Sequence, residues 1–354
     1  MNKGTNNIGA ILSLIRYFKS KEVVPSKNEE DKIWNDIVCE IENSRRKHRF
    51  IKMRNISIAS LSAAAMLAGA LWFLHFDRYE NNNDLMVAYQ SMNDYATESK
   101  EIKILAEDKQ MAEVKNNATI DYSKSDSQVE VDDKKIEKAE KVQYHQLVVP
   151  KGKHTRLILA DGSVMHVNAA TKVVYPDRFE DDRREIFVDG EIFIDVAKNE
   201  KVPFVVRTNS CDIQVLGTAF NVQAYKTDAN TEVALVRGSI KLKDKENKEL
   251  LLKPNELATV SENRIQGKKK VDASDYITWT KGLLKLDATP LSSVFKRLER
   301  YYGVQIAYSE EVGNMKMYGN LDLECPAEEV LRRLEYTAPI SFEKNNDKFS
   351  VRKR

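Results

Sequence analysis

Residues 155–167 read TRLILADGSVMHV, and this stretch decides the fold of the larger part of the chain. Runs rich in Val, Ile, Leu and Thr lie on both sides of the dipeptide Asp161-Gly162. Such runs favour β-strands, and Asp-Gly favours the tight turn of a hairpin over a catalytic role. The stretch therefore predicts two antiparallel strands joined by a short turn.

Similar short runs surround this hairpin, and no helical pattern separates them. They are LVVP (147–150), REIFVDGEIFIDV (184–196), PFVVRT (203–208), CDIQVLGTAFNVQAY (211–225), TEVALVRGSIKL (231–242) and ELLLKPNELATV (249–260). Turn-forming dipeptides such as Asp189-Gly190 and Pro254-Asn255 punctuate them. The pattern predicts an antiparallel β domain, a sandwich or roll, over residues 144–265.

After Gly267 the pattern changes to strands that alternate with helices. Thr289 and Pro290 can begin a helix that Gly303 ends. A second helix is expected over residues 326–336, and strands are expected over 283–286, 304–308, 316–323, 340–342 and 349–352. Residues 277–354 therefore predict a small α+β domain.

Before the β-rich part, residues 56–76 read ISIASLSAAAMLAGALWFLHF, without Asp, Glu, Lys or Arg. A helix of this length is about 30 Å long, which matches the bilayer core. A buried core helix is the alternative, but such a helix seldom lacks a polar face. We expect one transmembrane helix over residues 55–76.

The flanks of this segment set its orientation. Six basic residues lie close before it, and only Arg78 follows closely. The positive-inside rule therefore places the N-terminus in the cytoplasm and the C-terminal bulk outside, in the periplasm of a bacterial cell. The expected location is the inner membrane, crossed once.

Charge divides the 354 residues further, although the whole chain carries a net charge of only +2. Residues 77–143 hold 10 basic and 16 acidic residues, and we expect them to form a polar periplasmic linker, helical around residues 85–114 and disordered after that. The near balance of charge over the whole chain argues against direct nucleic-acid binding.

Residues 1–54 carry two amphipathic patterns. Apolar residues recur at helical spacing, at Ile8, Ile11, Leu12 and Ile15 and again at Ile33, Trp34, Ile37, Val38 and Ile41. So short a segment cannot bury two apolar faces by itself, so we expect a partner protein to cover them. A helix lying on the membrane surface is the alternative.

Signatures of enzyme chemistry are absent from the sequence: it has no GxSxG, P-loop, HExxH or GxGxxG motif. We expect no cofactor and no metal, and interpret His145, His154 and His166 as ordinary surface histidines, although a hairpin could bring His154 and His166 together. A disulfide between Cys211 and Cys325 is a further, weaker hypothesis.

One dipeptide could carry chemistry in cis. The hydroxyl of Thr218 could attack the carbonyl of Gly217 in an N-to-O acyl shift, provided that the backbone is strained there. The alternative is a bulge or a point of close packing, which is the usual role of glycine in a strand.

Five blocks of the β-rich part resemble the FecR family of transmembrane sigma-factor regulators. They are TRLILADGS (155–163) with VNA (167–169) and YP (175–176), GEIF (190–193), PFVV (203–206), VLGTAFNV (215–222) and VRGSI (236–240). The tail, with Trp279, Gly282, Leu283, Pro290-Leu291 and YYGV (301–304), looks like the domain that follows FecR in Bacteroidetes members, similar in fold to secretin and TonB short N-terminal domains.

The resemblance implies a non-enzymatic anti-sigma factor. Its cytoplasmic helices would hold an extracytoplasmic-function sigma factor, and its periplasmic part would sense the signalling domain of a TonB-dependent outer-membrane transporter. Some relatives cleave themselves at a Gly-Thr that matches Gly217-Thr218. A periplasmic carbohydrate-binding or envelope-scaffolding protein remains the alternative, since β-sandwiches often present ligand grooves.

Overall fold

The structure is a computed structural model, and it describes residues 84–91, 100–106, 109–125, 127–131, 134–139 and 141–354. The chain divides into two units, residues 1–81 and 82–354. The predicted cytoplasmic helices and the predicted membrane span therefore lie outside the described residues. Within the described ranges, no helix is both long and apolar enough to cross a membrane.

Most of the described chain is β-sheet, as predicted. The strands before the C-terminal module are β1 Ile102–Ala106, β2 Lys109–Val114, β3 Thr119–Asp121, β4 Gln128–Val131, β5 Lys134–Glu137, β6 Tyr144–Val149, β7 Thr155–Ile158, β8 Val164–Val167, β9 Thr171–Pro176, β10 Arg184–Asp195, β11 Phe204–Arg207, β12 Cys211–Val215, β13 Ala219–Ala224, β14 Asn230–Arg237, β15 Ile240–Asp244, β16 Glu249–Leu252, β17 Glu256–Ser261 and β18 Arg264–Lys270.

These strands make two sheets that enclose one apolar core, which is a sandwich. Sheet A runs β2-β1-β6-β9-β10-β11-β12-β15-β16. Sheet B runs β5-β4-β3-β7-β8-β10-β13-β14-β17-β18. The predicted hairpin at residues 155–167 is the pair β7-β8, with Thr155 opposite Val167.

Strand β10 belongs to both sheets and turns the corner between them at Gly190. Its first half pairs in sheet A and its second half in sheet B. Gly190 has φ 140°, and a Cβ there would lie 2.3 Å from Thr171 Oγ1. Only glycine fits this corner, because a side chain would meet both strain and a clash.

The sandwich is not wholly antiparallel, contrary to the prediction. Strands β10 and β11 pair in parallel, as do β3 and β7. The residues between β10 and β11 cross the sandwich, since β10 ends in sheet B and β11 pairs with its first half in sheet A. Parallel pairing follows from that crossing and not from a local sequence signal.

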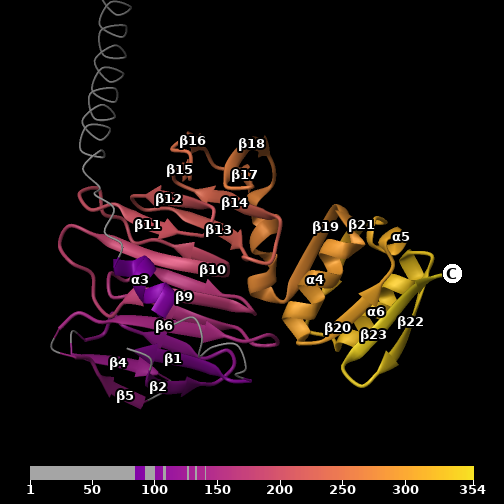
Figure 1. Ribbon diagram of the computed structural model, residues 1–354, viewed down its shortest axis with the longest axis horizontal. Helices are drawn as coiled ribbons and strands as arrows, with labels where there is room; N and C mark the ends of the chain where they lie inside the picture. Colours follow the sequence, from indigo (N-terminus) through magenta and orange to yellow (C-terminus); the bar gives the residue numbers. More distant parts are fainter. Residues whose placement is uncertain (1–83, 92–99, 107–108, 126, 132–133, 140) are drawn as a thin grey trace, which may run out of the picture. The chain divides into compact units, whose positions relative to one another are not determined.

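The expectation of a polar linker, helical near residues 85–114 and then disordered, holds only for the helix at residues 84–91 and is wrong for the described residues from 100 onward. Five strands, β1 to β5, lie there and extend both sheets (Figure 1). Ile102, Ile104 and Ile120 are buried in the sandwich core. The physical reason is a period of two: single apolar residues alternate with charged ones, so each strand buries one face despite a polar average.

Helix α3, Asp84–Ser91, is the one helix described in that region, and it lies across sheet A (Figure 1). Leu85 and Tyr89 pack with Val174 and Phe187. The Tyr89 and Phe187 rings are 4.0 Å apart between centroids, and the Tyr89 hydroxyl donates to Asp189 Oδ2 at 3.0 Å. The helix thus covers apolar surface on β9 and β10 that would otherwise face water.

The C-terminal module has its own apolar core, as the α+β prediction requires. Its elements are the 3₁₀ helix η2 Ala273–Lys281, β19 Leu283–Pro290, α4 Leu291–Tyr302, β20 Gln305–Tyr308, α5 Glu310–Gly313, β21 Lys316–Asp322, α6 Ala327–Thr337, β22 Ile340–Asn345 and β23 Lys348–Lys353. Strands β19 and β21 pair, and β20-β23-β22 form a second sheet.

Gly303 ends α4 with φ 70°, as predicted, because a left-handed residue closes the helix. The predicted start is wrong: β19 continues to Pro290, which takes the cap position, so Thr289 lies in the strand. Thr289 Oγ1 instead accepts from the backbone N–H of Asp287 at 3.1 Å. Helix α5 and η2 were not predicted.

Candidate functional site

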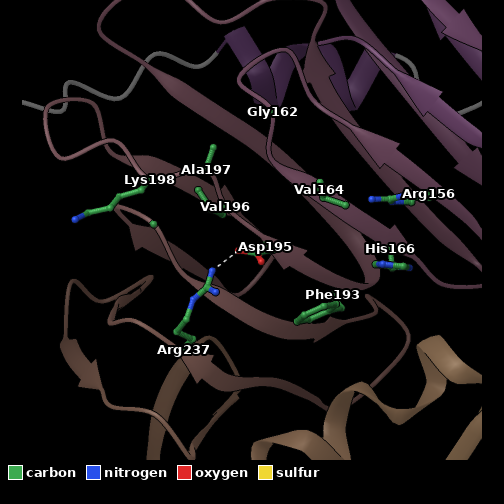
Figure 2. A pocket seen from close by; sticks show the side chains of 11 residues that line it. Arg156, Gly162, Val164, His166, Phe193, Asp195, Val196, Ala197, Lys198 and Arg237 are labelled. Carbon is green, nitrogen blue, oxygen red and sulfur yellow. Dashed lines mark hydrogen bonds and ion pairs between the residues drawn. The ribbon is translucent and has the colours of Figure 1, made fainter. Parts of the chain in front are cut away.

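A groove of about 580 Å³ lies on the outer face of sheet B (Figure 2). Its lining residues come from β7, β8, β10, β14 and the adjoining turns: Arg156, Gly162, Val164, His166, Phe193, Asp195, Val196, Ala197, Lys198, Gly217 and Arg237. The register explains this grouping, since Arg156 lies opposite His166 and His166 lies opposite Phe193. The groove has the size of a ligand-binding site.

The chemistry of the groove is cationic around an apolar floor. Arg237 Nη2 donates to Asp195 at 2.7 Å, and both side chains are about half exposed or more. Phe193 stacks on His166 with 6.0 Å between the ring centroids. Desolvation lowers the pKa of His166, and the neighbouring Arg156 and His154 lower it further, so this histidine is neutral at pH 7.

The dipeptide Gly217-Thr218 lies between β12 and β13, with Gly217 on the groove wall. A Cβ on Gly217 would lie 2.8 Å from the Cα of Lys198, so glycine permits close packing here. The Thr218 side chain is buried, and its hydroxyl donates to the carbonyl oxygen of Ser239 at 3.1 Å. A carbonyl oxygen accepts this hydrogen bond but is not a base that could remove the proton.

Gly238 also lies against the dipeptide. A Cβ on Gly238 would be 2.6 Å from Thr218 Oγ1 and 3.1 Å from the carbonyl oxygen of Gly217. Only glycine leaves room for both atoms. The structure thus brings a buried hydroxyl and a glycyl carbonyl together at a tightly packed point, while self-cleavage itself stays a prediction.

A second polar cluster lies where the C-terminal module meets the sandwich. Glu191 is 5% exposed and accepts from Asn168 Nδ2 at 2.8 Å and from Asn221 Nδ2 at 3.2 Å. The indole N–H of Trp279, from η2, donates to Asn221 Oδ1 at 3.0 Å. Burial raises the pKa of Glu191, an effect that Arg297 and other partners partly offset.

Helix α4 supplies the cations where the C-terminal module meets the sandwich. Arg300 donates to Asp228 at 2.9 Å and 2.5 Å and lies 3.7 Å above the ring of Tyr225. Arg297 donates to Gln223 Oε1 at 2.9 Å. Two contacts at right angles therefore hold the Arg300 guanidinium: the Asp228 carboxylate lies in its plane, and the Tyr225 ring lies against its face. A lysine ammonium cannot reproduce this geometry.

The backbone also joins the two parts. The N–H of Gly152 donates to the carbonyl oxygen of Arg300 at 2.8 Å, and the rings of His154 and Tyr301 stack at 5.9 Å between centroids. We call this set of contacts, from Glu191, Asn221 and Asp228 to Trp279 and Arg300, the junction.

The three histidines differ in environment. His145 is fully buried, so its interpretation as a surface histidine is wrong; it lies 2.6 Å from the Tyr122 hydroxyl. His154 and His166 are partly buried and close enough to influence each other. Within the described ranges, no three His, Cys, Asp or Glu side chains are grouped to hold a metal ion.

The two described cysteines, Cys211 and Cys325, are both free, so the disulfide hypothesis is wrong for this structure. Burial raises the pKa of the Cys211 thiol to about 11, which leaves it protonated and unreactive. The sigma-binding residues predicted at Ile8, Leu12, Ile15, Ile33, Trp34, Ile37 and Ile41 lie outside the described residues.

Sequence reasoning missed the junction. Its signal is a polar residue inside an otherwise apolar strand, as with Glu191 in β10 and Asn221 in β13. That signal is ambiguous, because such residues on an outward face are usually solvated. Only the position of η2 and α4 shows that these two are covered.

Comparisons with known proteins agree with this architecture. Residues 145–241 match the family model described as FecR protein, and residues 283–351 match the model described as FecR, C-terminal. No curated protein matches the chain.

Two solved structures of a candidate anti-sigma factor from Parabacteroides distasonis ATCC 8503 are also similar. The first, at 2.50 Å resolution, is 34% identical, with a TM-score of 0.56 over 60% of this chain and 99% of that chain. The second, at 1.65 Å, is 34% identical, with a TM-score of 0.55 over 59% of this chain and 99% of that one. The chain belongs to the FecR family of anti-sigma factors.

Proposed function

We propose that this chain is a single-pass inner-membrane anti-sigma factor that relays a signal from a TonB-dependent outer-membrane transporter to an extracytoplasmic-function sigma factor. The observation that carries the proposal is the pairing of both FecR matches in one folded unit. The apolar segment at residues 56–76 and the basic residues before it support the membrane topology, with residues 1–54 in the cytoplasm and the sandwich in the periplasm.

The junction supports a route for the signal. A transporter domain that binds the C-terminal module would pull or rotate α4, and Arg300 would transmit this motion to Asp228 and Tyr225 of the sandwich. A buried, geometrically exacting contact has few intermediate arrangements, so it switches between formed and broken states.

The sigma-factor step is tested by co-purification from cells that express the full chain. The sigma factor encoded beside this gene is expected to co-purify with the wild type. Replacing Ile33, Trp34, Ile37 and Ile41 with alanine should abolish this, because it removes one apolar face.

The matched control replaces Lys32, Asn35 and Glu40 of the same predicted helix with alanine. This variant should still bind the sigma factor. If the wild type binds no sigma factor, or if the apolar-face variant binds as well as the control, the cytoplasmic role is wrong.

Self-cleavage at Gly217-Thr218 is a second, separable part of the proposal. The close approach of Gly217, Thr218 and Gly238 supports it. Full-length Thr218→Ala should remain intact under conditions in which the wild type yields two fragments that stay associated through sheet pairing. Identical fragments from wild type and variant would remove this claim.

A further inference from the structure

The groove on sheet B has an uneven charge. Three cationic side chains line it, Arg156, Lys198 and Arg237, against the single carboxylate of Asp195. His166 adds no charge at neutral pH, because its pKa is lowered. Glu200, which pairs with Lys198, reduces the local charge to about +1, and the groove still attracts anionic ligands.

The cations are available to a ligand. Arg156 is exposed, and no hydrogen bond or ion pair of its side chain occurs within the described part of the chain. Lys198 pairs with Glu200 at 2.8 Å, but both side chains are more than 70% exposed. Solvent screens such a surface pair and makes it weak, so a ligand carboxylate can replace Glu200.

The cations are also spread out. Arg156 lies on β7, and Asp195, which holds Arg237, lies on β10, with β8 between them. Two strand spacings and two residues along the strand separate these positions by about 12 Å. Figure 2 shows Arg156 and Lys198 on opposite sides of the groove, so one small anion cannot reach both.

Between the cations the floor is apolar. Val164 and Phe193 are partly exposed on this face, and the Phe193 ring lies against neutral His166. A ligand that fills the groove must therefore combine separated negative charges with an apolar group between them. An extended peptide, which rises about 3.4 Å per residue, meets this requirement over three or four residues.

We infer that the groove binds an extended acidic peptide segment of a partner protein, with carboxylates at Arg156 and at Lys198 or Arg237 and an apolar side chain against Phe193. This site goes beyond the anti-sigma role, and peptide binding here does not depend on sigma-factor binding by residues 1–54.

Trp279 provides a reporter for occupancy. Its indole bonds Asn221, which lies opposite Phe193 in the register of β10 and β13. Trp34 and Trp72 are the other tryptophans of the chain. In the full chain in detergent, with Trp34→Phe and Trp72→Phe, titration with acetyl-Glu-Glu-Leu-Glu-Glu-amide should change the Trp279 emission saturably.

The variants make the test specific. Arg156→Glu should weaken binding of this peptide at least tenfold, and Phe193→Ala about fivefold. Lys135→Glu is the matched charge reversal, since Lys135 is an exposed residue on edge strand β5 of the same sheet; it should change affinity less than twofold.

Several results would overturn the inference. They are no saturable change with the wild-type groove, equal binding of acetyl-Gln-Gln-Leu-Gln-Gln-amide, equal weakening by Arg156→Glu and Lys135→Glu, or saturation by free glutamate at the same carboxylate concentration. The last result would indicate a small-anion site and not a peptide groove.

Discussion

The sandwich and the C-terminal module solve the problem of a stable core in different ways. Every buried polar or charged side chain of the described residues lies between Asp121 and Asp244, within the sandwich. Among the described residues of the C-terminal module, no polar or charged side chain is buried, and the core consists of apolar side chains. The sandwich therefore holds polar groups in its interior, whereas the module has an apolar interior and keeps its ion pairs at its surface and at the junction.

The largest expected effect tests whether the two cores are separate. Phe295 is fully buried in α4, and its ring lies 4.9 Å from that of Tyr308. Phe295→Ala should destabilise the module by about 3–5 kcal/mol through lost burial and a cavity. Hydrogen exchange should show faster exchange of amides in β20, β22 and β23, with protection of β10 and β13 unchanged.

The control for this variant is Tyr336→Ala, because Tyr336 is 82% exposed and its loss should cost less than about 0.5 kcal/mol. Equal loss of protection in β10 and β13 would mean that the two cores unfold as one, and the comparison would fail.

The second prediction concerns a pH dependence that only the sandwich should have. Burial lowers the pKa of His145 to about 4, from an unfolded value of about 6.5. The unfolded chain therefore binds a proton that the folded chain does not, and stability falls as pH falls from about 6.5 to about 4. The total loss should be about 3 kcal/mol.

The contribution of His145 to this pH dependence is measured by urea unfolding of the wild type and of His145→Phe at pH 7.5 and 4.5. The difference in the free energy of unfolding between the two proteins should shrink at the lower pH, because the variant has no histidine at position 145 to protonate. Tyr175→Phe is the control, because its ring lies beside that of His145 and neither Tyr nor Phe titrates between pH 4.5 and 7.5. An unchanged difference between pH 7.5 and 4.5 would contradict the burial of a neutral His145.

A smaller effect tests whether β1 to β5 belong to the sandwich. Val129 of β4 is fully buried, and Val129→Ala removes two methyl groups, which should cost about 2 kcal/mol. Amides of β7, which pairs with β3, should then exchange faster. Lys135→Ala on neighbouring β5 should change nothing. If Val129→Ala is also silent, these strands do not stabilise the sandwich.

The smallest effect concerns the junction. Trp279→Phe keeps the aromatic ring but removes the N–H that donates to Asn221. One lost hydrogen bond should lower the free energy of docking by about 1 kcal/mol. The readout is faster exchange of the η2 amides without change in β20 or β23, and equal exchange in wild type and variant would count against this bond.

Much of the fold could be predicted because its signals are local. The Asp161-Gly162 hairpin and the Gly303 helix end follow from residues that few other conformations accommodate. Strands β1 to β5 were missed because each contributes few apolar residues among charges, and their burial depends on pairing with β6 and β7.

Prediction of the junction and the groove depends even more on tertiary structure than prediction of the fold does. Glu191 and Arg300 are 109 positions apart in the sequence, and no local pattern shows that both belong to the junction. Arg156 and Lys198 likewise reach one groove only because β7, β8 and β10 are neighbours in sheet B. Gly217-Thr218 was identifiable by type, but its close approach to Gly238 was not.

The most direct test of the account is a charge swap at the junction, read out by transcription from a promoter of the neighbouring sigma factor. Arg300 and Asp228 are each about 12% exposed or less, so a single reversal places two like charges in a buried contact. Arg300→Asp and Asp228→Arg should each alter the response to the transporter signal, and the double variant should restore most of it. Wild-type responses from both single variants would contradict the claim that the junction couples the module to the sandwich.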